Sequence, residues 1–143
     1  MSLTKIETIT DAEWEIMRVV WTKKETTSTE IIEILDSKMA WKPSTVKTLL
    51  SRLVSKDYLF TRKEGKQFIY QASVLEENAV REARNELLDK ICNKKIGGMV
   101  YEIIEEKELS YSDIEKLEQL LAEKKKTAPG EVACNCIPGQ CQC

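Results

Sequence analysis

The sequence contains no histidine, and its 143 residues include only five glycines and three prolines. Histidine is the commonest general acid or base near neutral pH. The sequence also has no glycine-rich phosphate loop and no pair of carboxylates placed for acid–base chemistry. These absences argue against an enzyme. No apolar run approaches the length that spans a bilayer, and residues 1–7 lack the apolar core of a signal peptide. We therefore expect a cytoplasmic protein with no membrane partner.

Charge is distributed unevenly along the chain, although the net charge is only −2. Residues 38–66 contain eight lysines or arginines and two acidic residues, whereas residues 73–143 contain ten basic and fourteen acidic residues. A basic patch on an otherwise acidic chain concentrates polyanion binding on one surface, because counterions are released there. At 42% hydrophobic, the chain can bury the core of one domain, or of a small domain with an appendage.

Residues 43–56 form the segment around which the chain is organised. Apolar side chains recur there with the spacing of a helix that buries one stripe, at Val46, Leu49, Leu50, Leu53 and Val54. The other face carries hydroxyls and cations without a carboxylate: Ser44, Thr45, Lys47, Thr48, Ser51, Arg52 and Ser55. Hydroxyls and cations can donate to phosphates and base edges, so the segment predicts a DNA-binding helix. An ordinary amphipathic surface helix is the alternative.

Two helices are expected before this segment, over residues 9–21 and from about Ser28, with a turn at residues 36–42. Each opens on a threonine followed three residues later by a glutamate, the spacing of a capping box. The two pairs are Thr10 with Glu13 and Thr27 with Glu30. The tryptophans of the first helix are expected in the core.

A β-hairpin is expected after the segment, from residues 58–63 and 67–72, which are rich in aromatic and β-branched residues. Three helices followed by a hairpin is the order of a winged helix, which we place in residues 1–72. Cations near the hairpin tip, at Arg62, Lys63 and Lys66, are expected beside the DNA backbone. A solvated charged turn is the alternative.

Residues 73–126 predict a helical dimerisation domain. Their apolar stripe, from Ala79 to Ile91, lies too far along the chain to pack wholly on a small N-terminal domain, so a second copy is the natural cover. The expected helices start with a capping box at Ser73 and Glu76, break at Gly97 and Gly98, resume over residues 99–106 and end with residues 112–126. An intramolecular bundle is the alternative.

Residues 127–133 form a linker, and residues 134–143 contain four of the five cysteines. They form two Cys-x-Cys pairs: Cys134, Cys136, Cys141 and Cys143. A Pro-Gly turn between the pairs lets four thiolates converge on one metal, and soft thiolates favour Zn(II) or Cu(I). A disulfide framework competes, but a ring closed across one residue is strained. Cys92 stands alone in the sequence, and we expect a small buried hydrophobe there.

Four segments resemble copper-responsive transcriptional repressors of the CopY type, within the wider group of penicillinase and methicillin-resistance repressors (BlaI and MecI). They are TDAEWEIMRVVW at residues 10–21, TVKTLLSRL at 45–53, LSYSDIEKL at 109–117 and CNCIPGQCQC at 134–143. The first three are signals of the whole group. The cysteine tail separates copper repressors from their antibiotic-sensing relatives.

The resemblance implies a homodimer that binds an inverted-repeat operator with a TACA/TGTA core upstream of copper-export genes. Zinc in the tail would support DNA binding, and Cu(I) from a copper chaperone would displace it. Antibiotic-sensing relatives are inactivated by cleavage of an Asn-Phe bond, where this chain has Glu102-Ile103 in a gap-free alignment. Induction by cleavage is therefore not expected.

The sequence as a whole predicts a mainly α-helical protein with a small β-hairpin wing. The N-terminal winged helix-turn-helix would bind double-stranded operator DNA, and the C-terminal helices and cysteine tail would provide dimerisation and metal binding. The alternative function is a cytosolic metal-storage or copper-delivery protein with a helical interaction domain. Such a protein would explain the tail, but it would need neither a basic winged helix nor a dimerisation domain.

Overall fold

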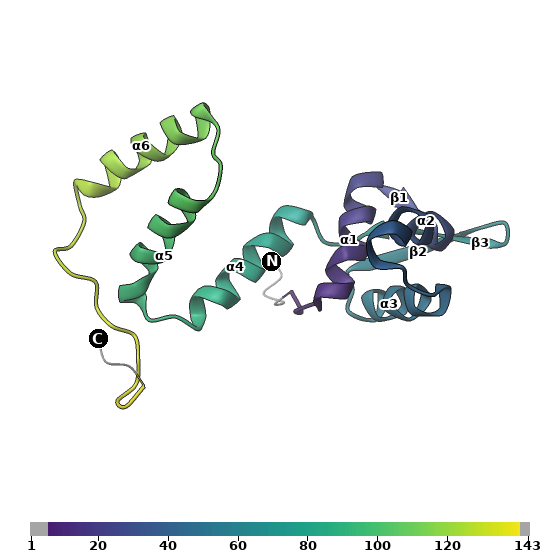
Figure 1. Cartoon of the computed structure of the whole chain (residues 1–143). Helices are drawn as coiled ribbons and strands as arrows, with labels where there is room; N and C mark the ends of the chain where they lie inside the picture. The colour runs from purple at the N-terminus through teal and green to yellow at the C-terminus, as the bar shows by residue number, and fades with distance from the viewer. Residues whose placement is uncertain (1–5, 141–143) are drawn as a thin grey trace. The chain divides into compact units, whose positions relative to one another are not determined.

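The computed structural model describes residues 6–140, and the chain divides into two compact units, Met1–Arg84 and Asn85–Cys143. The first unit contains α1 (Asp11–Lys23), β1 (Glu25–Thr26), α2 (Ser28–Met39), α3 (Pro43–Ser55), β2 (Leu59–Glu64), β3 (Gln67–Ala72) and the start of α4 (Glu76–Asp89) (Figure 1). The second contains the end of α4, α5 (Asn93–Glu106) and α6 (Tyr111–Lys125). The predicted mainly helical class with a small β-hairpin is confirmed.

The core of the first unit lies between its three N-terminal helices and the sheet. Its completely enclosed apolar side chains come from all three helices: Ile16, Met17, Val20, Ile31, Leu50 and Leu53. Full burial of each such side chain stabilises the fold by about 1.5–3 kcal/mol. The rings of Trp14 and Trp21 pack edge to face at 5.7 Å, and Trp21 Nε1 donates to the Val74 carbonyl oxygen at 2.8 Å. Both tryptophans therefore belong to the core region, as expected.

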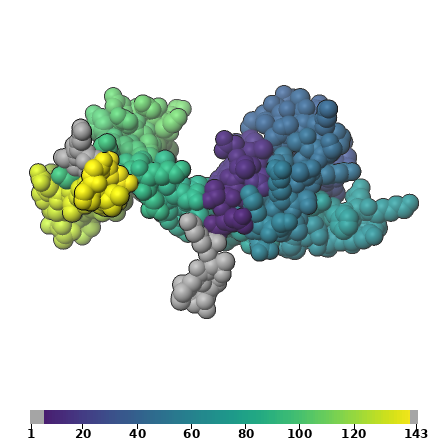
Figure 2. Space-filling model, turned by 90° about the horizontal axis from the view of Figure 1, so that it is seen from below, coloured from purple at the N-terminus to yellow at the C-terminus, as the bar shows by residue number. Residues whose placement is uncertain are grey.

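The sheet is antiparallel with the strand order β1-β3-β2, and its outer strand β1 was not predicted. That strand has two residues, too few to show a periodic pattern. Strands β2 and β3 pair from Leu59 with Ala72 to Glu64 with Gln67, which leaves a two-residue loop. Gly65 begins this loop at φ +63°, a conformation that favours glycine. The hairpin projects from the rest of the unit in Figure 1 and, in teal, in Figure 2.

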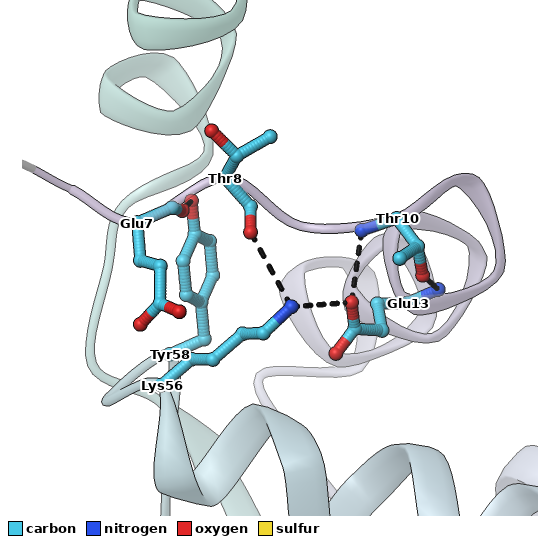
Figure 3. A network of polar contacts seen from close by, with 6 residues as sticks. All are labelled: Glu7, Thr8, Thr10, Glu13, Lys56 and Tyr58. Atoms are coloured by element: carbon cyan, nitrogen blue, oxygen red, sulfur yellow. Dashed lines mark hydrogen bonds and ion pairs between the residues drawn. The ribbon is translucent and has the colours of Figure 1, made fainter.

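A polar network joins the start of α1 to the end of α3 (Figure 3). Glu13 Oε1 accepts from the Thr10 backbone N–H and from Lys56 Nζ, both at 2.8 Å, and Thr10 Oγ1 accepts from the Glu13 N–H at 3.2 Å. Thr10 and Glu13 thus form the predicted capping box. Burial works to raise the pKa of Glu13, but the bonds from Lys56 and Thr10 outweigh it, so the pKa lies below its usual 4.5. The Glu13 side chain therefore stays ionised in the core.

Several helix ends differ from the sequence-based expectation. Helix α2 continues to Met39 and is closed by Ala40 in the left-handed conformation, so the turn before α3 is shorter than predicted. The expected box at Ser73 is wrong, because α4 starts only at Glu76. The Ser73 N–H instead donates to the Tyr58 carbonyl oxygen at 2.8 Å and extends the sheet.

The expected helix break at Gly97 and Gly98 is also wrong. Helix α5 runs through both glycines, and the chain leaves the helical path earlier, between Asp89 and Asn93. The apolar spacing on either side of the glycines stays helical, and this outweighs the roughly 1 kcal/mol that a glycine costs in a helix.

The helices of the second unit leave their large apolar side chains uncovered. No residue of α5 or α6, all of which the structure describes, is fully buried. The exposed side chains of this unit include Leu87, Val100, Tyr101, Ile103, Ile104, Tyr111, Ile114, Leu120 and Leu121. Among the described residues, the second unit therefore forms no closed core of its own.

Candidate functional site

The outer face of α3 presents the side chains that the sequence predicts for DNA contact. The inner stripe is buried at Val46, Leu49, Leu50 and Leu53, which fixes the orientation of the helix. The predicted contact residues are all exposed: Ser44, Thr45, Lys47, Thr48, Ser51 and Arg52. Pro43 is in the first turn, which contains no acidic residue. The exposed face therefore offers hydroxyl and cationic donors, as an anionic ligand requires.

A groove of about 510 Å³ lies between α3, the start of α2 and the wing. Its lining includes Lys47 of α3, Lys66 of the wing loop, and the hydroxyl side chains Thr27, Ser28 and Thr29. A helix N-terminus carries partial positive charge and free N–H groups, so this combination suits a phosphate. The sequence prediction included the two lysines and missed the three hydroxyl residues. Their signal was the hydroxyl run that opens α2.

The three predicted wing cations are in different environments. Arg62 Nη1 lies 2.8 Å from Glu25 Oε2, and Arg62 Nη2 lies 3.0 Å from Glu64 Oε2. Hydrogen bonds with Glu25 and Glu64 raise the pKa of Arg62, and the bond from Arg62 lowers the pKa of Glu25. Lys63 and Lys66 are also exposed, and within residues 6–140 neither forms such an ion pair. These two lysines can meet a phosphate without first losing a carboxylate partner.

In the second unit three cysteines come together: Cys92, Cys134 and Cys136. Their sulfur atoms all lie within 4.8 Å of one another, and Cys92 Sγ is 3.6 Å from Cys134 Sγ. The predicted ligands Cys141 and Cys143 lie outside the described residues. Cys92 is buried, as expected, but the expectation that it stands alone is wrong. No sequence spacing could have signalled a neighbour 42 residues away.

Backbone and amide groups shape the chain around these thiols. Asn135, between two of the cysteines, accepts from the Asn93 N–H at 2.8 Å through Oδ1, at the first residue of α5. The Cys136 N–H donates to Cys134 Sγ at 3.3 Å. Ile137 and Gln140 close a turn through a 3.0 Å backbone bond, with Gly139 at φ +85°. The predicted Pro-Gly turn is therefore present within residues 137–140, whereas the second Cys-x-Cys pair that it was expected to fold back lies outside the described residues.

The donor set fits a soft metal ion. Three sulfurs this close together offer the ligands that Zn(II) and Cu(I) prefer to hard cations. The backbone N–H of Lys94 is the main cause that lowers the pKa of Cys92. Partial burial, with hydrogen bonds to Cys134 and Cys92, raises the pKa of Cys136 to about 12. Cys92 therefore gives up its proton more readily than Cys136. A thiol must lose its proton to bind a metal.

In the described part of the chain, no helix combines the length and apolar character needed to cross a bilayer.

The family model described as the penicillinase repressor matches residues 9–123.

The chain is similar over most of its length to two bacterial proteins. An uncharacterized 16.5 kDa protein of Latilactobacillus sakei is 44% identical over 94% of this chain and 92% of that protein. The penicillinase repressor of Bacillus licheniformis is 33% identical over 86% of this chain and 96% of the repressor. The solution structure of the DNA-binding domain of the repressor BlaI aligns with a TM-score of 0.48 and 37% identity, covering 53% of this chain and 93% of that domain.

Proposed function

We propose that this chain, which belongs to the penicillinase repressor family, is a repressor that responds to copper. The family is one of transcriptional repressors and not of enzymes. The protein binds an inverted-repeat operator of copper-homeostasis genes in the cytoplasm as a zinc-loaded homodimer, and Cu(I) releases it. The observation that carries the copper response is the gathering of Cys92, Cys134 and Cys136 within 4.8 Å.

DNA binding is assigned to the first unit. Helix α3 enters the major groove, where Arg52 and Lys47 donate to base edges and the hydroxyls of Thr48 and Ser51 to bases or phosphates. Lys63 and Lys66 of the wing contact the backbone and add affinity without sequence preference. The groove at the start of α2 is placed to hold one phosphate between Ser28 and the two lysines that line it.

Dimerisation is assigned to the uncovered helices of the second unit. Many exposed apolar side chains on one face are unfavourable in water for a monomer. A second copy of the chain offers an identical apolar face that can cover them. Ile103 of α5 and Leu120 of α6 are 47% and 60% exposed, which supports such a partner. A dimer places two α3 helices on the two halves of an inverted repeat.

Metal binding is assigned to the tail thiolates. Cys134, Cys136, Cys141 and Cys143 would hold Zn(II) as a tetrahedral site, or more than one Cu(I) through shared sulfurs. The same thiolates would then enclose sites of different shape and charge. For DNA affinity to change, the DNA-binding form of the dimer must favour one of these metal states over the other.

The proposal is tested by fluorescence anisotropy of labelled operator DNA during an anaerobic Cu(I) titration of the zinc-loaded protein. We expect the zinc form to bind operator about 5- to 150-fold more tightly than the copper form, the usual range of allosteric coupling. The Cys134→Ser/Cys136→Ser variant should keep a folded first unit, whose core contains no cysteine, and should not respond to copper.

Three results would count against the proposal. DNA that stays bound after zinc has left, or release of the double variant as readily as the parent, would show that the tail is not the sensor. Failure of the metal-loaded protein to bind operator at any metal level would favour a metal-storage or copper-delivery protein.

A further inference from the structure

We propose that Cys92 is a ligand of the tail's metal site, so that the ion is held between the tail and the start of α5. This inference rests on the proposed metal response, and it names a ligand outside the Cys-x-Cys pairs. In a tetrahedral Zn(II) site Cys92 would take the place of one of the four tail thiolates. The tail would then be anchored to a helix of the second unit whenever the site is filled.

The sulfur positions carry the inference. Zinc–sulfur bonds of about 2.3 Å place the sulfurs of a tetrahedral thiolate site about 3.8 Å apart. Cys92 Sγ and Cys134 Sγ are 3.6 Å apart, and Cys136 Sγ lies within 4.8 Å of both. Only small shifts are needed for the three sulfurs to share one ion.

The hydrogen bonds of the tail give a second reason. Asn135 Oδ1 accepts from the Asn93 N–H, so the residue between two predicted ligands is bonded to the residue after Cys92. The Cys136 N–H donates to Cys134 Sγ at 3.3 Å, which holds these two cysteines of the tail close together. The approach of the tail to α5 is therefore supported by contacts that involve no thiol of Cys92.

The surroundings of Cys92 also suit a ligand. Its side chain is 8% exposed, so a bound ion would be shielded on that side from water and competing ligands. Lys90 and Lys95 line the same hollow and can offset the negative charge of several thiolates, although Asp89 lies there as well. A buried cysteine with no metal role would need no such polar surroundings.

The inference gives a route from metal to helix. Because Cys92 immediately precedes α5, an ion bound to it and to the tail fixes the first turn of that helix. A site confined to the tail would reach the start of α5 only through the hydrogen bond between Asn135 and Asn93. Zn(II) and Cu(I) differ in preferred ligand number, so they would constrain this junction differently.

The test starts from the full chain with Cys141→Ser and Cys143→Ser, in which only the three clustered cysteines remain. Cu(I) is added anaerobically and competed with the chelator bathocuproine disulfonate, and sulfur neighbours are counted by X-ray absorption. We expect about three sulfurs around Cu(I) in this variant. Adding Cys92→Ala should remove one sulfur and weaken Cu(I) binding by about tenfold or more, since even second-shell changes reach that size.

Two further variants separate ligation from packing. Cys92→Ser keeps the size of the side chain and should lose the same sulfur neighbour as Cys92→Ala. Asn135→Ala keeps all three thiols, so it should weaken binding less and leave the sulfur number unchanged. Circular dichroism at the helical wavelengths shows whether a variant has lost Cu(I) affinity because it has unfolded. If one of the two Cys92 variants is unfolded, the inference is judged on the other.

Unchanged Cu(I) affinity and sulfur number in both folded Cys92 variants would overturn the inference. The proposed function would still stand if Cys134→Ser/Cys136→Ser then abolished binding in the full chain. If the unaltered chain bound neither Zn(II) nor Cu(I), the proposed function would fail and the role of Cys92 with it.

Discussion

Arg62 Nη1 lies 2.8 Å from Glu25 Oε2, so a cation of the wing is already paired across the sheet to β1 before any DNA is present. Glu25 and Arg62 are about half exposed, and water screens such a pair. A phosphate that approaches Arg62 must compete with this carboxylate. The pair therefore positions Arg62 and also reduces its net charge towards DNA.

Replacing Glu25 by Gln removes the competing charge and should strengthen binding to DNA of any sequence. We expect an increase of about two- to fivefold at low salt, which disappears at high salt because exposed charges are screened. Anisotropy with operator and with random DNA measures it. Glu33→Gln changes the net charge equally on the exposed side of α2, so an equal gain there would mean that the Glu25–Arg62 pair plays no part.

Replacing Arg52 by Ala should weaken operator binding by about 1–3 kcal/mol and relax the preference at one base pair. Lys63→Ala should instead weaken binding to all sequences alike and flatten the salt dependence, because a phosphate contact is lost. Arg18→Ala, an exposed cation of α1, serves as the control. Unchanged operator affinity in Arg52→Ala would remove α3 from base recognition.

Glu13→Gln should lower the stability of the first unit by about 1–2 kcal/mol at pH 7, because charged hydrogen bonds from Lys56 and Thr10 are weakened. The pKa of Glu13 is lower in the folded protein than its usual 4.5, so its stabilisation is present above that pH. It is lost as the pH falls through the folded pKa. Urea unfolding of both proteins from pH 7 to pH 3 should show the two curves converging in acid, and a constant gap would refute the assignment.

Replacing Ile103 or Leu87 by Asp should separate the subunits of the proposed dimer, since an unpaired carboxylate in an apolar interface is strongly unfavourable. A monomer covers one half-site, so operator affinity should fall although α3 is unchanged. Gln119→Asp adds the same charge at an exposed polar position of α6 and should stay dimeric. Light scattering that reports a dimer for both apolar variants would exclude this interface.

Local rules predicted much of the first unit correctly. The helical spacing of Val46, Leu49, Leu50 and Leu53 identified both faces of α3, and the Thr10–Glu13 pair identified the start of α1. The same kind of rule failed at Ser73, because the sheet takes the backbone N–H there before the helix begins. A hydrogen bond to a distant strand leaves no trace in a short sequence window.

The thiol cluster shows the same limit at the site. The spacing of Cys134 and Cys136 was a local signal, and the structure places their two sulfurs within 4.8 Å of each other. Cys92 could be linked to them only by the path of the chain through α5 and α6. The Glu25–Arg62 pair was likewise hidden, since it depends on a strand of two residues.

The glycine pair inside α5 has a consequence for how that helix forms. Among residues 6–140, a Cβ at Gly97 or Gly98 would meet nothing within 4 Å, so packing against these residues does not require glycine there. The two glycines make the helix about 2 kcal/mol less stable than two alanines would. A helix as short as α5 is only marginally stable by itself. Nucleation of the first turn then decides its population, and Asn135 completes that turn by accepting from the Asn93 N–H. The tail thus supplies a hydrogen-bond acceptor to the first turn of α5 from 42 residues away, so we expect α5 to lose helicity when Asn135 is replaced by Ala.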